Sequence, residues 1–414
     1  MPNPRVDAQR LWDDLMTLAD ILDEGAPPHT RLAFGPAYAR ARDWLTGRFE
    51  DAGLAVRRDA AGSLIGARPG RRDLPPLAVG SHVDTVDGGG RFDGPLGVLA
   101  ALELARSLAD AGETLEHPLE IVDFTAEEPN PYGSSCVGSR AWAGTLDTRL
   151  LALENADGEP LATALVRAGG DPGRVHEAHR PAGVLAAYVE LHIEQGPILE
   201  RDGLDAGVVT GIVAIRRLLI SLAGKASHSG TTPIDVRRDA LPAAAEVVLA
   251  TERESRAAPG ELLATVGWLR VEPNAPNIVP GRVELVVEAR SLDPARRDAA
   301  LDAIAATARA AGEARRLDVD VRHLSEVPAV VCDPRIVAAL EAGCAEVGAT
   351  SRRLTSGAGH DASQVSHVAP VGMLFAPSRD GLSHHADEWT SPEQCALAAD
   401  ALLAGVRALD RALA

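Results

Sequence analysis

Short apolar runs that end in polar side chains recur along this sequence, and they indicate the buried strands of an α/β fold. Three such runs lie at residues 76–80, 119–124 and 186–194. Each run has the length of a strand, and a segment with helical periodicity at 99–108 separates the first two. In open α/β folds the residues that follow the carboxyl ends of strands supply the ligand chemistry. The polar residues behind these runs are therefore the first candidates for a functional site.

The run 119–124 is followed by two adjacent carboxylates, Glu127 and Glu128. Successive side chains at a strand end point to opposite sides, so the two carboxylates face different directions. One of them can then bind a metal ion while its neighbour accepts a proton from a metal-bound water. An isolated Glu-Glu pair is more often two solvated side chains in a loop, so this interpretation depends on further ligands elsewhere in the chain.

The run 76–80 leads into His82 and Asp84, which lie on the same side of an extended segment. The carboxylate can accept the second imidazole N–H and fix the tautomer of a metal-binding histidine. An ordinary loop histidine is the alternative. Asp93 stands in a glycine-rich loop before the predicted helix. It could bridge two cations, which need an anionic ligand between them, or it could cap the helix.

The run 186–194 places Glu190, His192 and Glu194 on one face of a strand. Polar groups are buried together only where something such as a metal ion satisfies them. We therefore interpret His192 as a metal ligand, and Gln195, beside a turn glycine, as available to hydrogen-bond a substrate.

Residues from about 328 onward are expected to return to the first domain. A glycine-containing loop at 354–362 leads into a helix, and the pair His384-His385 follows a strand at 373–377. His384 is the natural last ligand, although the spacing alone leaves open which histidine of the pair binds.

Composition limits the kind of protein that this chain can be. The formal charge of −18 argues against nucleic acid or an anionic membrane as a partner. No apolar run approaches the ~18 residues of a membrane span, and the first residues lack the apolar core of a signal peptide.

The four cysteines show no C-x-x-C pairing, so neither a disulfide framework nor a cysteine zinc site is expected. Cys136 is predicted to be a packed small residue, because no nearby base is evident. We expect a soluble, cytoplasmic protein.

The organisation changes near residue 210. From there the order of elements is strand, helix, strand, strand, helix, strand, which predicts a small α/β sandwich at 213–327, inserted into a larger domain made of residues 1–212 and 328–414. The insert carries polar loops around His228 and Asn277, and Arg290 on the strand that follows. These residue types suit an oxyanion and a substrate carboxylate, with solvated loop side chains as the alternative.

Taken together, the polar segments form a specific set of motifs: H-V-D-T-V, G-R-F-D-G-P-L-G-V, E-E, H-I-E-Q-G-P, H-S-G-T-T-P, P-N-x-x-N-I-V-P-G, S-G-A-G-H-D-A and S-H-x-x-x-E. The chain resembles the hydantoinase/carbamoylase branch of the di-metal aminoacylase and carboxypeptidase superfamily, nearly from end to end. That branch includes N-carbamoyl-L-amino acid hydrolase, β-ureidopropionase and allantoate amidohydrolase. The resemblance implies a di-metal aminopeptidase-like catalytic domain with an inserted α/β sandwich that serves as lid and dimerisation domain.

The resemblance also implies a role for each matching residue. Two divalent ions (Zn, Mn, Co or Ni) would be bound by His82, Asp93, Glu128, His192 and His384. Asp93 would bridge the ions, Asp84 would stand behind His82, and Glu127 would take a proton from the bridging water and hand it to the leaving nitrogen. The substrate would be held by Gln195, His228, Asn277, Arg290, Gly359 and His360. Arg290 would grip the substrate's α-carboxylate, and His228 would support the oxyanion of the partner subunit's site in a homodimer.

The expected activity is metal-dependent hydrolysis of the ureido C–N bond of an N-carbamoyl-L-amino acid or a similar ureido acid. Allantoate amidohydrolase and an N-acyl-amino acid amidohydrolase or peptidase of the same superfamily are the alternatives. A metal-free binding protein would predict a damaged ligand set, and all five ligand positions are intact. Three departures from the family pattern concern the substrate rather than the ligands, namely the stiff Pro129-Asn130-Pro131 segment, Ser229 and Glu288.

Overall fold

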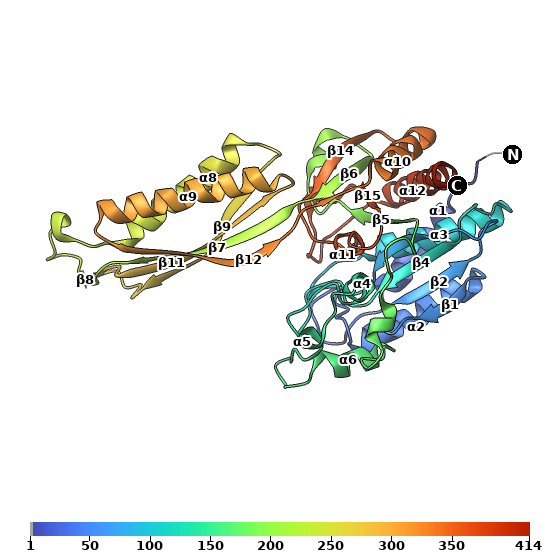
Figure 1. Cartoon of the computed structure of the whole chain (residues 1–414), viewed down its shortest axis with the longest axis horizontal. Helices are drawn as coiled ribbons and strands as arrows, with labels where there is room; N and C mark the ends of the chain where they lie inside the picture. Colours follow the sequence, from blue (N-terminus) through green and yellow to red (C-terminus); the bar gives the residue numbers. More distant parts are fainter. Residues whose placement is uncertain (1–2) are drawn as a thin grey trace. The chain divides into compact units, whose positions relative to one another are not determined.

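A mixed sheet forms the centre of the first of two units in the computed structural model, which describes residues 3–414 (Figure 1). Unit 1 comprises the chain up to Thr210 and again from Cys332 on, and unit 2 comprises Gly211–Val331. The insert expected at 213–327 falls within unit 2, whose bounds lie a few residues further out on both sides.

Four neighbouring strands of the sheet are parallel and form its centre, in the order β4 (Leu119–Phe124), β3 (Leu77–His82), β5 (Ala187–Ile193) and β15 (Val371–Ala376). Antiparallel pairs extend the sheet on both sides. On one side β2 (Leu64–Arg68) pairs with β4, and β1 (Ala55–Arg58) pairs with β2. On the other side β6 (Ala206–Ile212) pairs with β15. β13 (Val330–Val331) and β14 (Ser351–Ser356) pair with β6.

Every residue of the four parallel strands is buried, which shows that both faces of these strands are covered, as is usual for parallel sheets. One group of helices packs together and against the strands: α1 (Ala8–Ala19), α3 (Pro95–Asp110), α10 (Pro334–Val347) and α12 (Pro392–Leu413). A second group is α4 (Val137–Ala143) with α11 (Asp361–Val365). The remaining helices of unit 1 are α2 (Pro36–Asp51), α5 (Thr148–Leu151), α6 (Leu161–Arg167) and α7 (Ile198–Asp202). The α/β class expected from the alternating runs is confirmed.

Unit 2 is an antiparallel sheet covered on one face by two helices (Figure 1). The strand order is β12 (Asp318–Val327), β7 (Ala214–Ala223), β11 (Arg282–Ser291) and β9 (Leu263–Glu272), and the helices are α8 (Ala240–Ala257) and α9 (Pro294–Ala314). Along β11 buried and less buried side chains alternate, as in a sheet with one face on a core. A short ribbon of β8 (Ser227–His228) and β10 (Ile278–Val279) completes the unit.

The last strand of the insert was expected from the sequence to span only residues 318–321, but β12 is longer. Its second half, from Arg322 on, consists of exposed side chains that carry no apolar alternation, but its backbone continues to pair with β7. Among the described residues no helix has both the length and the apolar character needed to span a bilayer.

Candidate active site

The carboxyl ends of the four parallel strands define the position of the site in unit 1. His82 is the last residue of β3, Glu127 and Glu128 follow β4, and His192 lies near the end of β5. His384 follows β15 by a short connection. Because parallel strands end at the same edge of a sheet, residues far apart in the sequence are brought to one place.

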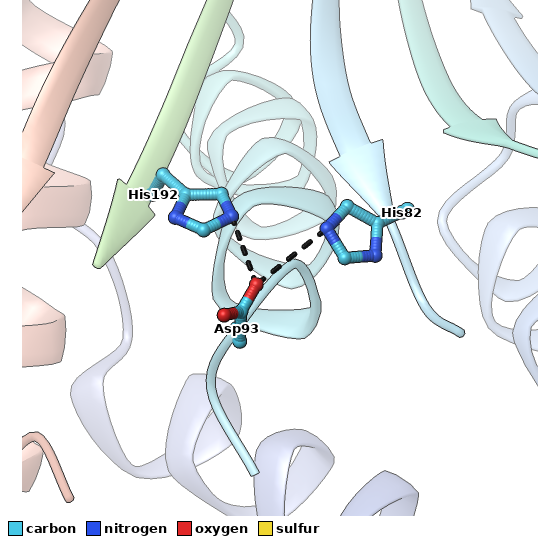
Figure 2. Close-up of side chains that lie close together, drawn as sticks. All are labelled: His82, Asp93 and His192. Atoms are coloured by element: carbon cyan, nitrogen blue, oxygen red, sulfur yellow. Dashed lines mark ion pairs between the residues drawn. The ribbon is translucent and has the colours of Figure 1, made fainter. Parts of the chain in front are cut away.

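One group of side chains converges on a single carboxylate oxygen (Figure 2). His192 Nε2 lies 3.1 Å and His82 Nε2 lies 3.7 Å from Asp93 Oδ1. All three side chains are buried. They point toward one another from β3, from β5 and from the loop before α3, and their ligand atoms lie within 4.8 Å of one another.

The other oxygen of Asp93 faces a second group. His384 Nε2 lies 3.4 Å from Asp93 Oδ2 and 3.1 Å from Glu128 Oε1. The neighbouring His385 instead has Nδ1 3.8 Å from an oxygen of Asp387. The structure therefore places His384 at the site, where the spacing of the sequence left the two histidines undecided.

These two groups fit a pair of divalent ions that share Asp93. Imidazole nitrogens and carboxylate oxygens are the ligands that zinc, manganese, cobalt and nickel accept in proteins. The electrostatics agree, since the carboxylates of Asp93 and Glu128 raise the pKa of His384 to about 10. Burial alone would lower the pKa of His192, but the facing Asp93 raises it to about 9. Burial lowers the pKa of the third histidine, His82, to about 4, so the feature of this pocket that favours a cation is the negative charge of Asp93 and Glu128.

Asp93 is placed by a close approach of backbone to the ring of His82. The sequence predicted a helix from residue 99, but α3 begins at Pro95 and its N-cap is Gly94, so Asp93 is not the cap. A Cβ on Gly94 would lie 2.4 Å from the ring of His82, and its φ is +84°. Glycine is therefore required here by both space and conformation.

Asp84 has different hydrogen-bond partners from those expected. His82 Nδ1 lies 3.1 Å from the backbone oxygen of Asp84 and 3.6 Å from its carboxylate. The carboxylate accepts the backbone N–H groups of Glu127 and Glu128, at 3.2 and 3.1 Å. Asp84 thus lies next to His82 as expected, but its carboxylate holds the backbone of Glu127 and Glu128 and does not hydrogen-bond the imidazole.

Glu127 faces the first group of ligands. Its Oε2 lies 3.7 Å from His82 Nε2, and the side chain is buried. Burial and the nearby Asp361 carboxylate raise the pKa of Glu127 well above its ordinary value. A raised pKa suits a carboxylate that has to hold a proton during a reaction.

Gln195 and His360 also lie at this edge of the sheet. Gln195 Nε2 donates to Asp93 Oδ2 at 2.7 Å, so in this structure the amide binds the shared aspartate. The ring of His360 packs edge-on against that of His192, with centroids 4.6 Å apart, and Gly359 precedes it in the loop before α11. The Nε2 of His360 lies 2.7 Å from Ser356 Oγ.

Glu190, His192 and Glu194 were expected to share one face of the strand, with something such as a metal ion to satisfy them. Glu190 does lie near His192 and His360 in a further group of possible metal ligands, but both glutamates also have protein partners. Glu190 accepts hydrogen bonds from Ser81 Oγ and from the backbone N–H of Ala362. Glu194 accepts the backbone N–H groups of the first turn of α7, at 2.9 and 2.8 Å. These partners satisfy both glutamates without an ion, and the start of a helix directly after the strand is the signal that could have revealed this for Glu194.

Three further residues lie at the site, and the sequence had predicted no role there for any of them. Ser383 Oγ donates to Asp93 Oδ2, and the buried Glu388 accepts the backbone N–H groups of Phe92 and Asp93 at 2.7 and 3.2 Å. Glu388 ends the S-H-x-x-x-E motif, which was a signal for it. Cys136 was predicted to be a packing residue, but its Sγ lies 3.3 Å from Glu127 Oε1.

The remaining expected substrate residues lie in unit 2. His228 pairs with Ile278 across the β8–β10 ribbon, and the backbone oxygen of Asn277 accepts the N–H of Ser229. Arg290, on β11, donates through Nε to Glu288 at 2.7 Å. The ribbon therefore brings His228 and Asn277 together, while Arg290 lies on the main sheet of the unit.

Known proteins resemble the chain along its whole length. Residues 78–411 match the family described as peptidase family M20/M25/M40. An N-carbamoyl-L-amino acid amidohydrolase from Geobacillus stearothermophilus is 41% identical over 398 residues, which cover 96% of this chain and 97% of that protein. A ureidoglycolate hydrolase from Arabidopsis thaliana is 33% identical over 94% of this chain and 84% of its own length. The crystal structure of a hydantoinase/carbamoylase family amidase from Burkholderia multivorans has a TM-score of 0.91 at 36% identity and covers 99% of both chains. The chain is therefore a hydrolase that belongs to peptidase family M20/M25/M40, in its hydantoinase/carbamoylase branch.

Proposed function

We propose that this chain hydrolyses the ureido C–N bond of N-carbamoyl-L-amino acids. The observation that carries the proposal is the pair of ligand groups that share Asp93, with the buried carboxylate of Glu127 beside one of them. The name of the relative that is 41% identical over nearly the full length supports the choice of a carbamoyl substrate.

In the proposed site His82, Asp93, Glu128, His192 and His384 would hold two divalent ions, which would lower the pKa of a bound water and polarise the carbamoyl oxygen. Glu127 would take a proton through Oε2 and later hand it to the leaving nitrogen. Asp84 holds the backbone of Glu127 and Glu128 in place by its two hydrogen bonds. The products are the amino acid, ammonia and carbon dioxide.

Substrate binding is assigned by the family resemblance. Within unit 1, Gln195 and His360 lie beside the ligand groups, and Gly359 precedes His360 in the loop before α11. We assign the oxyanion of the partner subunit's site to His228 and a further substrate contact to Asn277. The α-carboxylate is assigned to Arg290, whose planar guanidinium can bind a carboxylate with two parallel hydrogen bonds.

The experiment that tests this function is a substrate panel on protein reconstituted separately with Zn, Mn, Co or Ni. The panel contains N-carbamoyl-L-amino acids, their D-isomers, N-acetyl-L-amino acids, a dipeptide, allantoate and ureidoglycolate. We expect the highest kcat/KM for an N-carbamoyl-L-amino acid and loss of activity when a chelator removes the metal. A preference for the acetyl compounds or the dipeptide would contradict the proposal, and a preference for allantoate or ureidoglycolate would move the chain to that neighbouring activity.

We further propose that unit 2 forms a homodimer through its sheet edge. β9 is an edge strand of that sheet, and it exposes Leu263, Trp268 and Leu269. An exposed apolar edge strand is a template for pairing with another chain. Light scattering on the purified protein should give twice the chain mass, and Leu269→Lys should shift it toward the monomer; a monomeric wild type would refute the proposal.

A further inference from the structure

The thiol of Cys136 lies against the glutamate that we propose as the proton carrier. Its Sγ is 3.3 Å from Glu127 Oε1, which is within hydrogen-bond distance for sulfur. Cys136 is buried and is not part of a disulfide. Burial and the negative charge of Glu127 raise the pKa of this thiol well above its ordinary value, so the sulfur carries its proton and can donate it.

The backbone holds Cys136 in this position. Three consecutive N–H groups, those of Cys136, Val137 and Gly138, donate to the backbone oxygens of Glu127, Ala126 and Thr125 at 2.7, 3.0 and 2.8 Å. A Cβ at Gly138 would lie 2.5 Å from the backbone nitrogen of Thr125, so the two segments are in close contact. Cys136 itself has a φ of +54°, an uncommon conformation that this pairing maintains.

The two oxygens of Glu127 have different surroundings. Oε1 faces the thiol, and Oε2 faces His82 Nε2 at 3.7 Å. A glutamate side chain has three rotatable bonds, and a general base acts only when its oxygen is within reach of the proton that it takes. Catalytic bases are accordingly often oriented by a third group on their far side.

We propose that Cys136 is a positioning residue, whose S–H donates to Oε1 of Glu127 and thereby keeps Oε2 directed toward the ligand groups. This inference rests on the proposed function, in which Glu127 carries the proton. It goes beyond that function because it assigns the orientation of the base to a thiol that binds neither the metal nor the substrate.

Two variants of Cys136 distinguish the effect of losing the hydrogen bond from the effect of losing side-chain volume. Cys136→Ala removes the donor, whereas Cys136→Ser replaces the thiol by a hydroxyl, which is also a donor. On the best substrate of the panel we expect Cys136→Ala to lower kcat about tenfold, with unchanged KM and unchanged metal content. Cys136→Ser should recover at least half of the wild-type kcat. Cys344→Ala, which removes another buried thiol far from Glu127 in the sequence and lying in α10, should match the wild type.

A second measurement does not depend on turnover. The S–H stretching band of Cys136, isolated as the infrared difference between wild type and Cys136→Ser, should lie at lower frequency than that of an unbonded thiol. In Glu127→Gln it should move to higher frequency, because a neutral amide is a weaker acceptor than a carboxylate. If the band shifts as expected while no ureido substrate is turned over, the proposed function fails but the hydrogen bond stands. An unshifted band, a wild-type kcat in Cys136→Ala, or an equal loss in the alanine and serine variants would overturn the positioning role.

Discussion

At the scale of single residues, the site consists of carboxylates whose two oxygens have different partners. Asp93 faces the two histidines of the strands with Oδ1 and His384 with Oδ2. Asp84 uses one oxygen for the N–H of Glu127 and the other for that of Glu128. The two adjacent glutamates also have different partners, since Glu127 faces Cys136 and His82 whereas Glu128 faces His384, and this difference makes their roles experimentally separable.

We expect Glu127→Gln to lower kcat by about three orders of magnitude or more, as loss of an essential general base does, while the metal content of the protein stays at the wild-type level. Glu128→Gln should instead lower the metal content, because Glu128 lies against His384 in a ligand group. Metal analysis of the dialysed proteins, together with kcat, distinguishes the two variants. Metal loss in Glu127→Gln with retention in Glu128→Gln would show that their roles are reversed. Glu177→Gln, on the exposed surface, is the matched control.

The polar residues at strand ends could be found from the sequence because apolar runs predict strands, and strand ends predict ligands. His82, Glu127, Glu128 and His192 all follow this logic. Cys136 could not be found in this way, since its contact depends on pairing of residues 136–138 with residues 125–127. The orientation of Gln195 toward Asp93 was equally hidden, because it depends on a residue 102 positions away in the chain.

At the scale of elements, the site depends on how closely α3 approaches the sheet. Asp93 precedes the N-cap of this helix, Gly94, and Gly97 in the first turn of the helix faces β5. A Cβ at Gly97 would lie 2.2 Å from the backbone oxygen of Leu191 and 2.7 Å from Cβ of Ser81. The glycine therefore sets the distance between the helix and the strands that carry the histidines.

Gly97→Ala should push α3 away from β5 and carry Asp93 with it. We expect the free energy of unfolding to fall by about 1–3 kcal/mol, as for other overpacked sites, and metal affinity to fall as well. Chemical denaturation and metal titration measure the two effects. Gly47→Ala in α2 is the control, because a Cβ there meets nothing within 4 Å and alanine favours a helix. A Gly97→Ala protein as stable as the wild type would contradict the packing argument.

The boundaries of elements were harder to predict than their order. The strand at 119–124 agrees with β4 residue for residue, because its apolar run is bounded on both sides. The start of α3 was placed too late, since Pro95 and Gly97 interrupt the apolar periodicity although proline at the first helical positions is favourable.

At the scale of the whole molecule, the proposed substrate residues are divided between two units with separate sheets and cores. Unit 2 buries its own apolar cluster between its sheet and the helices α8 and α9. The sequence predicted this division because the order of elements changes near residue 210. It could not supply the contacts of Arg290, whose Nε donates to Glu288 on the same strand.

Arg290 provides the sharpest test of the roles assigned to unit 2. If its guanidinium binds the α-carboxylate, Arg290→Ala should raise KM for an N-carbamoyl-L-amino acid about tenfold or more and change kcat little. The corresponding α-carboxamide lacks the negative charge, so the variant and the wild type should have the same kcat/KM for it. Arg322→Ala removes another arginine of the same sheet, which pairs with Asp320 on β12, and should leave both substrates unaffected. An equal loss for the acid and the carboxamide would mean that Arg290 supports the fold of unit 2 and does not recognise the carboxylate.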